Sequence, residues 1–438
     1  MNIFDILGPV MIGPSSSHTA GIVRIGNAAR DILGHTPSHA RIVFFGSLAK
    51  TYQGHGSDKA IVAGLMGFAP DDLRIRDSLQ LADEMGLQYE IETSNEKIEK
   101  NMEEVEYSNT LLIFLENLTT IQAASIGGGN IIIQKVNGKD VNSKGNYEIA
   151  TIHFDSLNEM IEQAEEEGIS ISALTLRQTA IDAGLSEDDV TMKMHVKLDV
   201  MKKAAMEGVA EGLHSISGLT SDWAFRLKNY YQGGGICGSF VGEVLYTALA
   251  VMQSNACMSR IVAAPTAGSC GILPGCLIAL QNHHDISDDK LVEGMFNASA
   301  VGMVIAKKAT LAGADGACQA ECGSAAAMAA SAITEIMGGT PTMCGIAAAL
   351  ALKSLLGLVC DPVAGLVEEP CIIRNASSAA VALASAEMAL AGMPSVIPVD
   401  EVISAMDAVS KQIPASLRET AEGGVAATPT GRAIAERI

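Results

Sequence analysis

The sequence is poor in aromatic residues and in charged residues. Phe, Trp and Tyr make up 4% of the 438 residues and charged residues 18%, whereas hydrophobic residues make up 48%. A chain this long and this apolar excludes general disorder and can bury more than one core. The scarcity of aromatic rings excludes a core built on large aromatic side chains. Because Ala and Gly fill the second half, we expect closely packed helices with small side chains at their contacts there.

Basic residues are too few to balance the acidic ones. The chain has 29 Lys and Arg against 50 Asp and Glu, a formal net charge of -21. Such a surface repels phosphate backbones and anionic lipids, so neither nucleic acid nor a membrane is expected as a partner. A small anionic substrate is still compatible with this charge, because one carboxylate needs only a local group of hydrogen-bond donors.

No segment has the pattern of a targeting sequence or of a membrane span. Residues 1–14 lack a basic region followed by an apolar run, and Glu335, Lys353 and Glu387 interrupt the long apolar stretches of the second half. We therefore expect a cytoplasmic protein without membrane-spanning helices. A homodimer is expected only because two-fold dimers are the commonest oligomers.

Cysteine is absent from the first 236 residues, and all nine thiols lie between Cys237 and Cys371. This odd, uneven set does not fit a disulfide framework. In a reducing compartment it indicates either metal or redox chemistry, or buried small hydrophobic residues, the usual role of a free cysteine. The chain has no C-x-x-C pair, which argues against a zinc ribbon, a ferredoxin-type carrier and a thioredoxin-like site.

Three of these cysteines, Cys318, Cys360 and Cys371, form the strongest candidate for a metal site. On one straight helix, the eleven positions from Cys360 to Cys371 would separate the two thiols by about 16 Å. Prolines and a glycine in residues 361–370 break such a helix and allow both thiolates to reach one point. Cys322 could share a helix face with Cys318 and is a rival ligand, and the spacing leaves this choice open.

The pattern of hydrophobic residues predicts two domains of different class. Strand-like runs at 41–45, 110–114 and 130–136 alternate with helical patterns in the first part. Helical spacing begins after a cap at Asp155 or Ser156, and the rest of the chain is nearly free of strand patterns. We therefore expect an α+β domain followed by a mostly α-helical domain. The polar, turn-rich stretch 136–147 marks the boundary, which gives domains 1–147 and 148–438.

A cluster of hydroxyl residues, Ser15 to Thr19, precedes the helical run that begins at Ile22. Hydroxyls and free backbone N–H groups at a helix start can bind a carboxylate or phosphate, although a plain helix cap is the commoner role. His55 lies between Gly54 and Gly56, where a ligand could approach the imidazole closely. It is a candidate general base because its ordinary pKa lies near neutrality, and a loop histidine without a catalytic role is the alternative.

Two further loops are candidates for ligand contact. The glycines at 127–129 follow Ser125 between strand-like runs and indicate either a bulge or close approach of a ligand. They lack the spacing of a dinucleotide fingerprint, and no Gly-Lys-Ser/Thr ending of a P-loop follows them. The loop 265–271 joins two apolar helices, and its sequence alone does not decide between a tight connection and a substrate contact.

Taken together, these segments resemble the iron-sulfur-dependent L-serine dehydratases, with the β-type and α-type portions fused in one chain. The resemblance extends over nearly all of the sequence. In the family's order the segments are GPSSSHTAG from Gly13, GSLAKTYQGHGSDKA from Gly46, SIGGG from Ser125, SGLT from Ser217, IVAAPTAGSCGILPG from Ile261, CQAECGSAAAMAA from Cys318, CDPVAGLVEEPCIIRNA from Cys360 and ATPTGR from Ala427.

The resemblance implies an oxygen-sensitive lyase that converts L-serine to pyruvate and ammonia. It implies a [4Fe-4S] cluster held by Cys318, Cys360 and Cys371, whose open iron is a Lewis acid for the substrate hydroxyl. His55 would take the Cα proton, and no pyridoxal phosphate is implied. The residues implied in recognition of the small amino-acid substrate are Ser15, Ser16, Ser17, His18, Thr19, Ser125, Gly127, Gly128, Gly129, Thr266, Ala267, Gly268 and Ser269.

Three departures from the family pattern leave alternatives open. Tyr107 stands where many members have His, and Cys237 interrupts the usual small-residue run, so a related cysteine desulfidase or threonine dehydratase is an alternative. The sequence ends in Arg437-Ile438, without the C-terminal Cys that occupies the open iron in some members. The many thiols also suit a non-catalytic iron-sulfur sensor, which would normally close all four irons with protein ligands.

Overall fold

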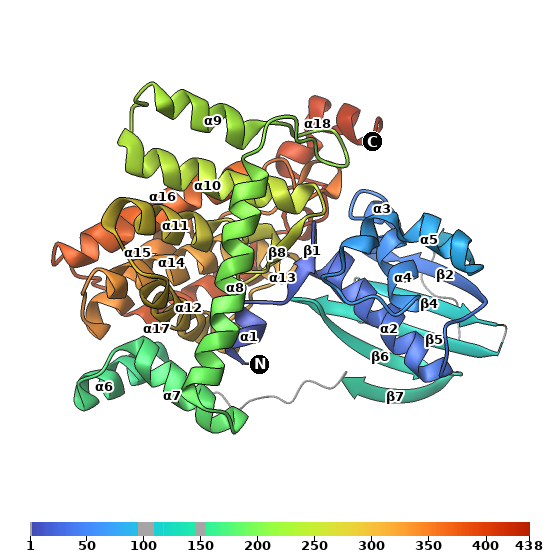
Figure 1. Ribbon diagram of the computed structural model, residues 1–438, viewed down its shortest axis with the longest axis horizontal. Helices are drawn as coiled ribbons and strands as arrows, with labels where there is room; N and C mark the ends of the chain where they lie inside the picture. Colours follow the sequence, from blue (N-terminus) through green and yellow to red (C-terminus); the bar gives the residue numbers. More distant parts are fainter. Residues whose placement is uncertain (1, 95–108, 117, 145–153) are drawn as a thin grey trace.

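The computed structural model describes residues 2–94, 109–116, 118–144 and 154–438. Figure 1 shows a sheet-containing part and a larger helical part lying side by side. This confirms the expected class, an α+β region followed by a mostly helical one. The predicted boundary at 147/148 and Tyr107 lie outside the described residues.

The first part is built on one mixed sheet of six strands. Their order is β3-β2-β4-β5-β6-β7, with β2 and β3 parallel and the other neighbouring pairs antiparallel. The predicted strands at 41–45, 110–114 and 130–136 are confirmed within β2, β4 and β6. The elements of this part are α1 (Ile3–Ile6), β1 (Val10–Ile12), η1 (Ser16–Ala20), α2 (Gly21–Leu33), β2 (His39–Phe45), α3 (Gly46–Thr51), α4 (Ser57–Leu65), η2 (Leu73–Asp77), α5 (Ser78–Met85), β3 (Gln88–Ser94), β4 (Thr110–Leu115), β5 (Thr119–Gly127), β6 (Asn130–Val136) and β7 (Lys139–Lys144).

Helices α2 and α4 pack against the sheet and against each other (Figure 1). Their contact is very close at Gly26 and Gly64, where a Cβ on Gly26 would lie 2.8 Å from Gly64 Cα. Fully buried Ile42 and Phe44 of β2 form part of the core beneath them. This packing fixes the start of α2, which carries the hydroxyl cluster.

The second part is helical, with one short strand, β8, among its described residues. Its elements are α6 (Leu157–Glu167), α7 (Ile171–Ala183), α8 (Glu187–Gly208), α9 (Trp223–Gln232), α10 (Gly238–Ala256), β8 (Arg260–Val262), η3 (Ala267–Ser269), α11 (Ile272–His284), α12 (Asp288–Lys308), α13 (Gly313–Cys318), η4 (Gln319–Gly323), α14 (Ser324–Ile336), α15 (Pro341–Leu355), η5 (Val363–Gly365), α16 (Cys371–Leu390), α17 (Val399–Gln412), η6 (Ala415–Leu417), η7 (Gly424–Ala427) and α18 (Pro429–Ala435). No helix among the described residues is long and apolar enough to cross a membrane.

Small residues allow the helices of this part to pack around α14. Every residue of α14 is buried, and its sequence, SAAAMAASAITEI, has few bulky side chains. Helices α12, α15 and α16 surround it. The expectation of closely packed helices with small contacts is confirmed.

The first residues of the chain pack with the helical part, not with the sheet. Strand β1 pairs antiparallel with β8, Val10 opposite Val262. Ile6 of α1 lies against Gly302 of α12, where a Cβ would come within 2.4 Å of the Ile6 side chain. The hydroxyl cluster that follows β1 is therefore held at the junction of the two parts.

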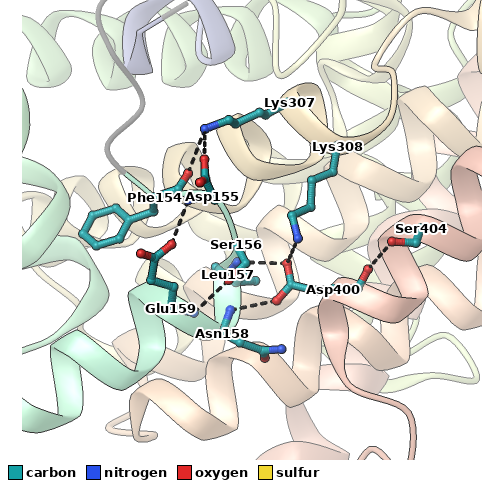
Figure 2. A network of polar contacts seen from close by, with 10 residues as sticks. All are labelled: Phe154, Asp155, Ser156, Leu157, Asn158, Glu159, Lys307, Lys308, Asp400 and Ser404. Atoms are coloured by element: carbon teal, nitrogen blue, oxygen red, sulfur yellow. Dashed lines mark hydrogen bonds and ion pairs between the residues drawn. The ribbon is translucent and has the colours of Figure 1, made fainter.

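Polar contacts anchor the start of α6 on the helical part (Figure 2). Of the two predicted caps it is Ser156 that caps the helix, its Oγ accepting from the Glu159 N–H at 3.0 Å. The Asp400 carboxylate of α17 accepts from the N–H groups of Leu157 and Asn158 at 3.0 and 2.8 Å. It also pairs with Lys308 of α12 at 3.2 Å. Helices α6, α12 and α17 are thereby joined at one point.

Candidate active site

A cavity of about 880 Å³ lies between the two parts of the chain. The sheet side contributes Ser15 to His18, Asn109 and the turn between β5 and β6. The helical side contributes Thr266, Gly268 and residues of three cysteine-bearing segments. Because both sides form its walls, neither part alone would make this site.

Cys318 and Cys360 meet at the wall of the cavity. Their sulfur atoms and a carboxylate oxygen of Glu321 all lie within 4.8 Å of one another. Cys318 is the last residue of α13, and Cys371, the first residue of α16, lines the same cavity as Cys360. Two buried thiols within 4.8 Å of each other, with the third thiol on the wall of the same cavity, are soft ligands that suit a thiophilic metal centre better than a hard cation.

The Arg374 guanidinium supplies positive charge to this thiol group. Its Nη1 donates to Cys318 Sγ at 3.6 Å and to the Val359 carbonyl oxygen at 2.8 Å. Its Nη2 pairs with buried Asp361 at 2.7 Å. Hydrogen bonds from the thiols of Cys322 and Cys360, with help from Arg374, hold the pKa of Cys318 well below its usual range. Cys318 is therefore the thiol of the group that ionises first.

The chain turns back between Cys360 and Cys371, as the prolines and glycine predict. The Val363 N–H donates to the Glu369 carbonyl oxygen at 2.8 Å and closes the turn. Ala364 and Gly365 both have positive φ, 55° and 73°. This turn, and not a helix, allows both thiols to reach one cavity.

The carboxyl groups of Glu321 and Glu419 both lie close to Gly313, beside the thiols. A Cβ on Gly313 would lie 2.7 Å from Glu321 Oε2 and 3.4 Å from Glu419 Oε2. Burial, the neighbouring Glu419 and Cys318 raise the pKa of Glu321 well above its usual value. Burial and Cys318 raise the pKa of Glu419 to about 7. The Thr266 hydroxyl donates to Glu321 Oε1 at 2.7 Å and fixes this side chain.

The hydroxyl cluster forms a hydrogen-bonded turn at the start of α2. Ser15 Oγ accepts from the His18 N–H at 3.1 Å, and Ser17 Oγ lies 3.0 Å from His18 Nδ1. The Thr19 hydroxyl donates to the His55 carbonyl oxygen at 2.8 Å and does not line the cavity. The helix-cap role is therefore present, and Ser15 to His18 also face the cavity.

His18 lies between the cavity and the predicted base His55. The two ring centroids are 4.6 Å apart, and only His18 lines the cavity. Burial lowers the pKa of His18 to about 4 and that of His55 well below its usual value, so both imidazoles are neutral near pH 7. The backbone of Thr51 partly opposes this lowering of the His55 pKa, and neither ring nitrogen of His55 has a hydrogen bond of normal geometry among the described residues. Both rings are therefore in the unprotonated form that a general base requires.

The glycines beside His55 serve packing and not ligand approach. A Cβ on Gly54 would lie 2.0 Å from the Leu366 side chain, in the turn between Cys360 and Cys371. Gly56 begins α4 with φ 60°. The prediction that these glycines leave room for a ligand beside His55 is therefore wrong, because the Leu366 side chain occupies the space beside Gly54.

The turn between β5 and β6 brings backbone to the cavity. Gly127 and Gly128 line it with φ of 96° and 59°, together with Ser125. Gly129 lies behind them, its carbonyl oxygen accepting from Arg24 at 2.6 Å. Positive φ at successive positions explains the three glycines.

Two buried asparagines hold the loop 265–271 in place. Asn255 Nδ2 donates to the carbonyl oxygens of Pro14 and Ala267 at 2.8 and 3.3 Å, and so joins this loop to the start of the hydroxyl cluster. Asn375 Nδ2 donates to the carbonyl oxygens of Gly268 and Cys371 at 2.8 and 2.9 Å. The loop is therefore tied directly to the thiol site.

Comparison with known proteins identifies the family. A family model described as Serine dehydratase beta chain matches residues 2–136, and one described as Serine dehydratase alpha chain matches residues 154–426. The chain belongs to the serine dehydratase family. It carries the beta-chain and alpha-chain regions in one polypeptide, as the sequence resemblance predicts.

Relatives of this serine dehydratase match along nearly the whole chain. The L-serine dehydratase of Mycobacterium bovis is 32% identical over 97% of this chain and 97% of its own. The L-serine dehydratase TdcG of Escherichia coli is 31% identical over 97% of this chain and 98% of its own. The probable L-serine dehydratase alpha chain of Bacillus subtilis is 44% identical over 65% of this chain and 95% of its own.

The predicted site residues of this serine dehydratase divide into two groups. Those that line the cavity are Ser15, Ser16, Ser17, His18, Ser125, Gly127, Gly128, Thr266, Gly268, Cys360 and Cys371. Those outside its lining are Thr19, His55, Gly129, Ala267, Ser269 and Cys318. Members of the second group lie directly behind or beside the first, so position alone does not decide their roles.

Many of the residues that line the cavity were not predicted from the sequence, and four polar ones stand out. Glu321, Arg418 and Glu419 line it on the helical side, and Asn109 lines it on the sheet side. Asn109 is 7% exposed, and its Oδ1 has no hydrogen-bond partner among the described residues. Glu321 could have been noticed as an acidic residue inside a run of small apolar ones. The other three carry no comparable signal, because they reach the cavity from loops distant in sequence.

Proposed function

We propose that this serine dehydratase is an L-serine ammonia-lyase that releases pyruvate and ammonia, and that it uses a [4Fe-4S] cluster held by Cys318, Cys360 and Cys371. One observation carries the proposal. A single cavity is bounded on one side by hydroxyl, amide and backbone donors, and on the other by two of these thiols. A small amino acid would fit between recognition groups and a reactive centre.

The thiol site suits the cluster by its chemistry. All nine cysteines are free, and Cys318, Cys360 and Cys371 are buried in the protein. Arg374 beside them would offset part of the negative charge of a thiolate-bound cluster. When bound, the cluster supplies a Lewis acid for the substrate hydroxyl.

The sheet side would recognise the amino-acid backbone of the substrate. Ser15, Ser16 and Ser17 offer hydroxyls to its carboxylate, and Lys50 and Arg418 line the same cavity with positive charge. The unpartnered Asn109 Oδ1 is an acceptor suited to the substrate ammonium group. These contacts would place Cα and its proton near His18.

The two neutral imidazoles would remove the Cα proton. His55 is the base that the family resemblance indicates, and His18 is the imidazole that faces the cavity. Loss of the Cα proton and of the β-hydroxyl as water gives aminoacrylate. Its imine form then takes up water and yields pyruvate and ammonia, so the net reaction is L-serine to pyruvate plus ammonia.

An anaerobic substrate comparison tests the proposal. Protein reconstituted with iron and sulfide should form pyruvate from L-serine. Its kcat/KM for L-serine should be higher than its kcat/KM for L-threonine or L-cysteine. A higher kcat/KM for L-cysteine or L-threonine would instead establish the related desulfidase or threonine dehydratase. A full cluster without turnover, and without a spectral change on addition of L-serine, would favour a sensor.

The location and assembly of the protein are two further parts of the proposal. We place it in the cytoplasm because nine unpaired thiols suit a reducing compartment. We propose a homodimer, which sedimentation of the anaerobic protein would test.

A further inference from the structure

A buried carboxylate holds the segment between Cys360 and Cys371 from behind. Glu368 lies three residues before Cys371 and is 3% exposed. Its Oε1 accepts a hydrogen bond from Ser217 Oγ at 2.7 Å, and its Oε2 accepts one from Thr220 Oγ1 at 3.1 Å. Both oxygens of the carboxylate are thus held by hydroxyls from a segment about 150 positions away.

The hydroxyl donors belong to a tight turn between α8 and α9. The Ser215 N–H donates to the Thr220 carbonyl oxygen at 3.0 Å, and Ser215 Oγ accepts from the Thr220 N–H at 3.3 Å. Ser217 Oγ also accepts from the Leu219 N–H at 3.1 Å. These bonds hold both hydroxyls in place without Glu368, so the turn is a fixed support.

Other residues of the thiol-bearing segment rest on the sheet part. Leu366 packs against Gly54, and Gly365 packs against Thr51, where a Cβ on the glycine would lie 2.5 Å from Thr51 Cγ2. The segment therefore contacts both the loop that carries His55 and the turn 215–220. Loss of the hydrogen bonds to the turn would leave it held mainly by its contacts with the sheet part.

The main chain of Glu368 connects this support to the thiol itself. The Ile372 N–H donates to the Glu368 carbonyl oxygen at 2.8 Å and so joins the first turn of α16, which begins at Cys371. A shift of Glu368 would thus shift the start of the helix and its thiol. Losing one bond to a buried carboxylate leaves the charged group underpaired, which makes such a shift favourable.

We propose that Glu368, Ser217 and Thr220 form a positioning unit, here called the carboxylate latch, that sets the placement of Cys371 relative to Cys360 for the metal cluster. The inference rests on the proposed function for the identity of the cluster. The latch residues do not line the cavity, so they act through the thiols and not on the substrate.

Three variants test the latch. Thr220→Val keeps the shape of the side chain and removes one hydrogen bond, and Ser217→Ala removes the other. Glu368→Gln retains the shape and can bond both hydroxyls, because its amide donates to one and accepts from the other. The matched control is Glu335→Gln, which changes another buried carboxylate that is held by Ser172 and Asn297 away from the cavity.

Two readouts are independent of turnover. In the metal-free anaerobic protein, we measure the alkylation rate of Cys371 relative to that of buried Cys276. In the reconstituted protein, we measure iron content and the rate of cluster loss to a chelator. Thr220→Val and Ser217→Ala should raise both rates about tenfold, Glu368→Gln should raise them less, and Glu335→Gln should leave them unchanged.

The outcomes separate the latch from the proposed function. If the parent protein takes up no iron, the cluster assignment fails, and the alkylation rates still decide the latch. If the parent binds a cluster but Thr220→Val and Ser217→Ala show parental rates, the latch is refuted. An equal increase in Glu335→Gln would also refute it, because the effect would then reflect general destabilisation. Should one hydroxyl variant fail to fold, the other decides.

Discussion

The imidazole rings of His18 and His55 lie against each other with centroids 4.6 Å apart and planes tilted by 34°. The Ser57 hydroxyl donates to the His18 carbonyl oxygen at 2.6 Å, and the Thr19 hydroxyl donates to that of His55 at 2.8 Å. The pair is therefore held by its backbone, and only one member reaches the cavity. This arrangement makes the proton-transfer roles of the two residues separable by mutation.

Replacement of His55 by Gln should lower kcat by about 10²- to 10⁴-fold, because the proposed base is lost. His18→Gln should raise KM as well, since His18 lines the cavity. The measurement is steady-state pyruvate formation with L-serine carrying hydrogen or deuterium at Cα. His35→Gln is the control, because His35 is exposed and pairs with Glu116 far from the cavity. If His18→Gln abolishes removal of the Cα proton while His55→Gln still removes it, the base is His18.

Stability should fall between pH 6.5 and pH 4 because His18 is buried in its neutral form. Its pKa is about 4 in the folded protein and about 6.5 in the unfolded chain, so the unfolded state binds more protons in this range. The stabilisation is complete above pH 6.5 and is lost as the pH falls towards 4. Urea unfolding of the metal-free protein at pH 6.5 and pH 5 should show a loss of about 2 kcal/mol from this residue.

The control for this pH dependence is His18→Gln, in which the contribution of His18 is absent. The difference in unfolding free energy between the parent and this variant should shrink as the pH falls from 6.5 to 5. An identical pH dependence in both proteins would show that His18 does not stay neutral on folding.

The choice between Cys318 and Cys322 should be settled by iron content. Cys318 contacts Cys360 and Arg374 at the cavity wall, whereas Cys322 packs with the helical core. Cys318→Ser, Cys360→Ser and Cys371→Ser should each lose the cluster after anaerobic reconstitution, and Cys322→Ser should retain it. The reverse result for Cys318 and Cys322 would make Cys322 the ligand.

Asp400→Asn should lower the free energy of unfolding by about 1–3 kcal/mol. The substitution removes the negative charge that accepts hydrogen bonds from two N–H groups of α6 and pairs with Lys308 (Figure 2). The loss is measured by urea unfolding of the metal-free protein. Asp155→Asn is the control, because Asp155 pairs with Lys307 at the surface and such pairs contribute about 0–1 kcal/mol. Equal effects of the two substitutions would contradict the role of Asp400.

Local sequence patterns predicted part of the secondary structure. Strand-like apolar runs predicted β2, β4 and β6, and a cap at Asp155 or Ser156 predicted the start of α6. The packing of α1 and β1 against the helical part was not predictable from such patterns. It depends on pairing with β8, some 250 positions later, and local periodicity carries no information on distant partners.

The site was predictable where its residues form compact motifs. The hydroxyl cluster, the turn after β5, Cys360 and Cys371 were all found from the sequence, and they meet at one cavity. Asn109 and the adjacent pair Arg418 and Glu419 were missed because they form no motif with each other in the sequence and meet only in the folded chain. Gly54 was misinterpreted because its neighbour Leu366 is more than 300 positions away.

By itself the sequence determined the family, the change from α+β to helical structure, and the turn that separates Cys360 from Cys371. These properties depend on residue identity and short-range geometry. Only the tertiary structure decided that His18 stands before His55, that Glu321 and Glu419 face one point, and that Glu368 is held by Ser217 and Thr220. Each of these depends on which distant side chains share a buried space, and the packing of the whole chain sets that.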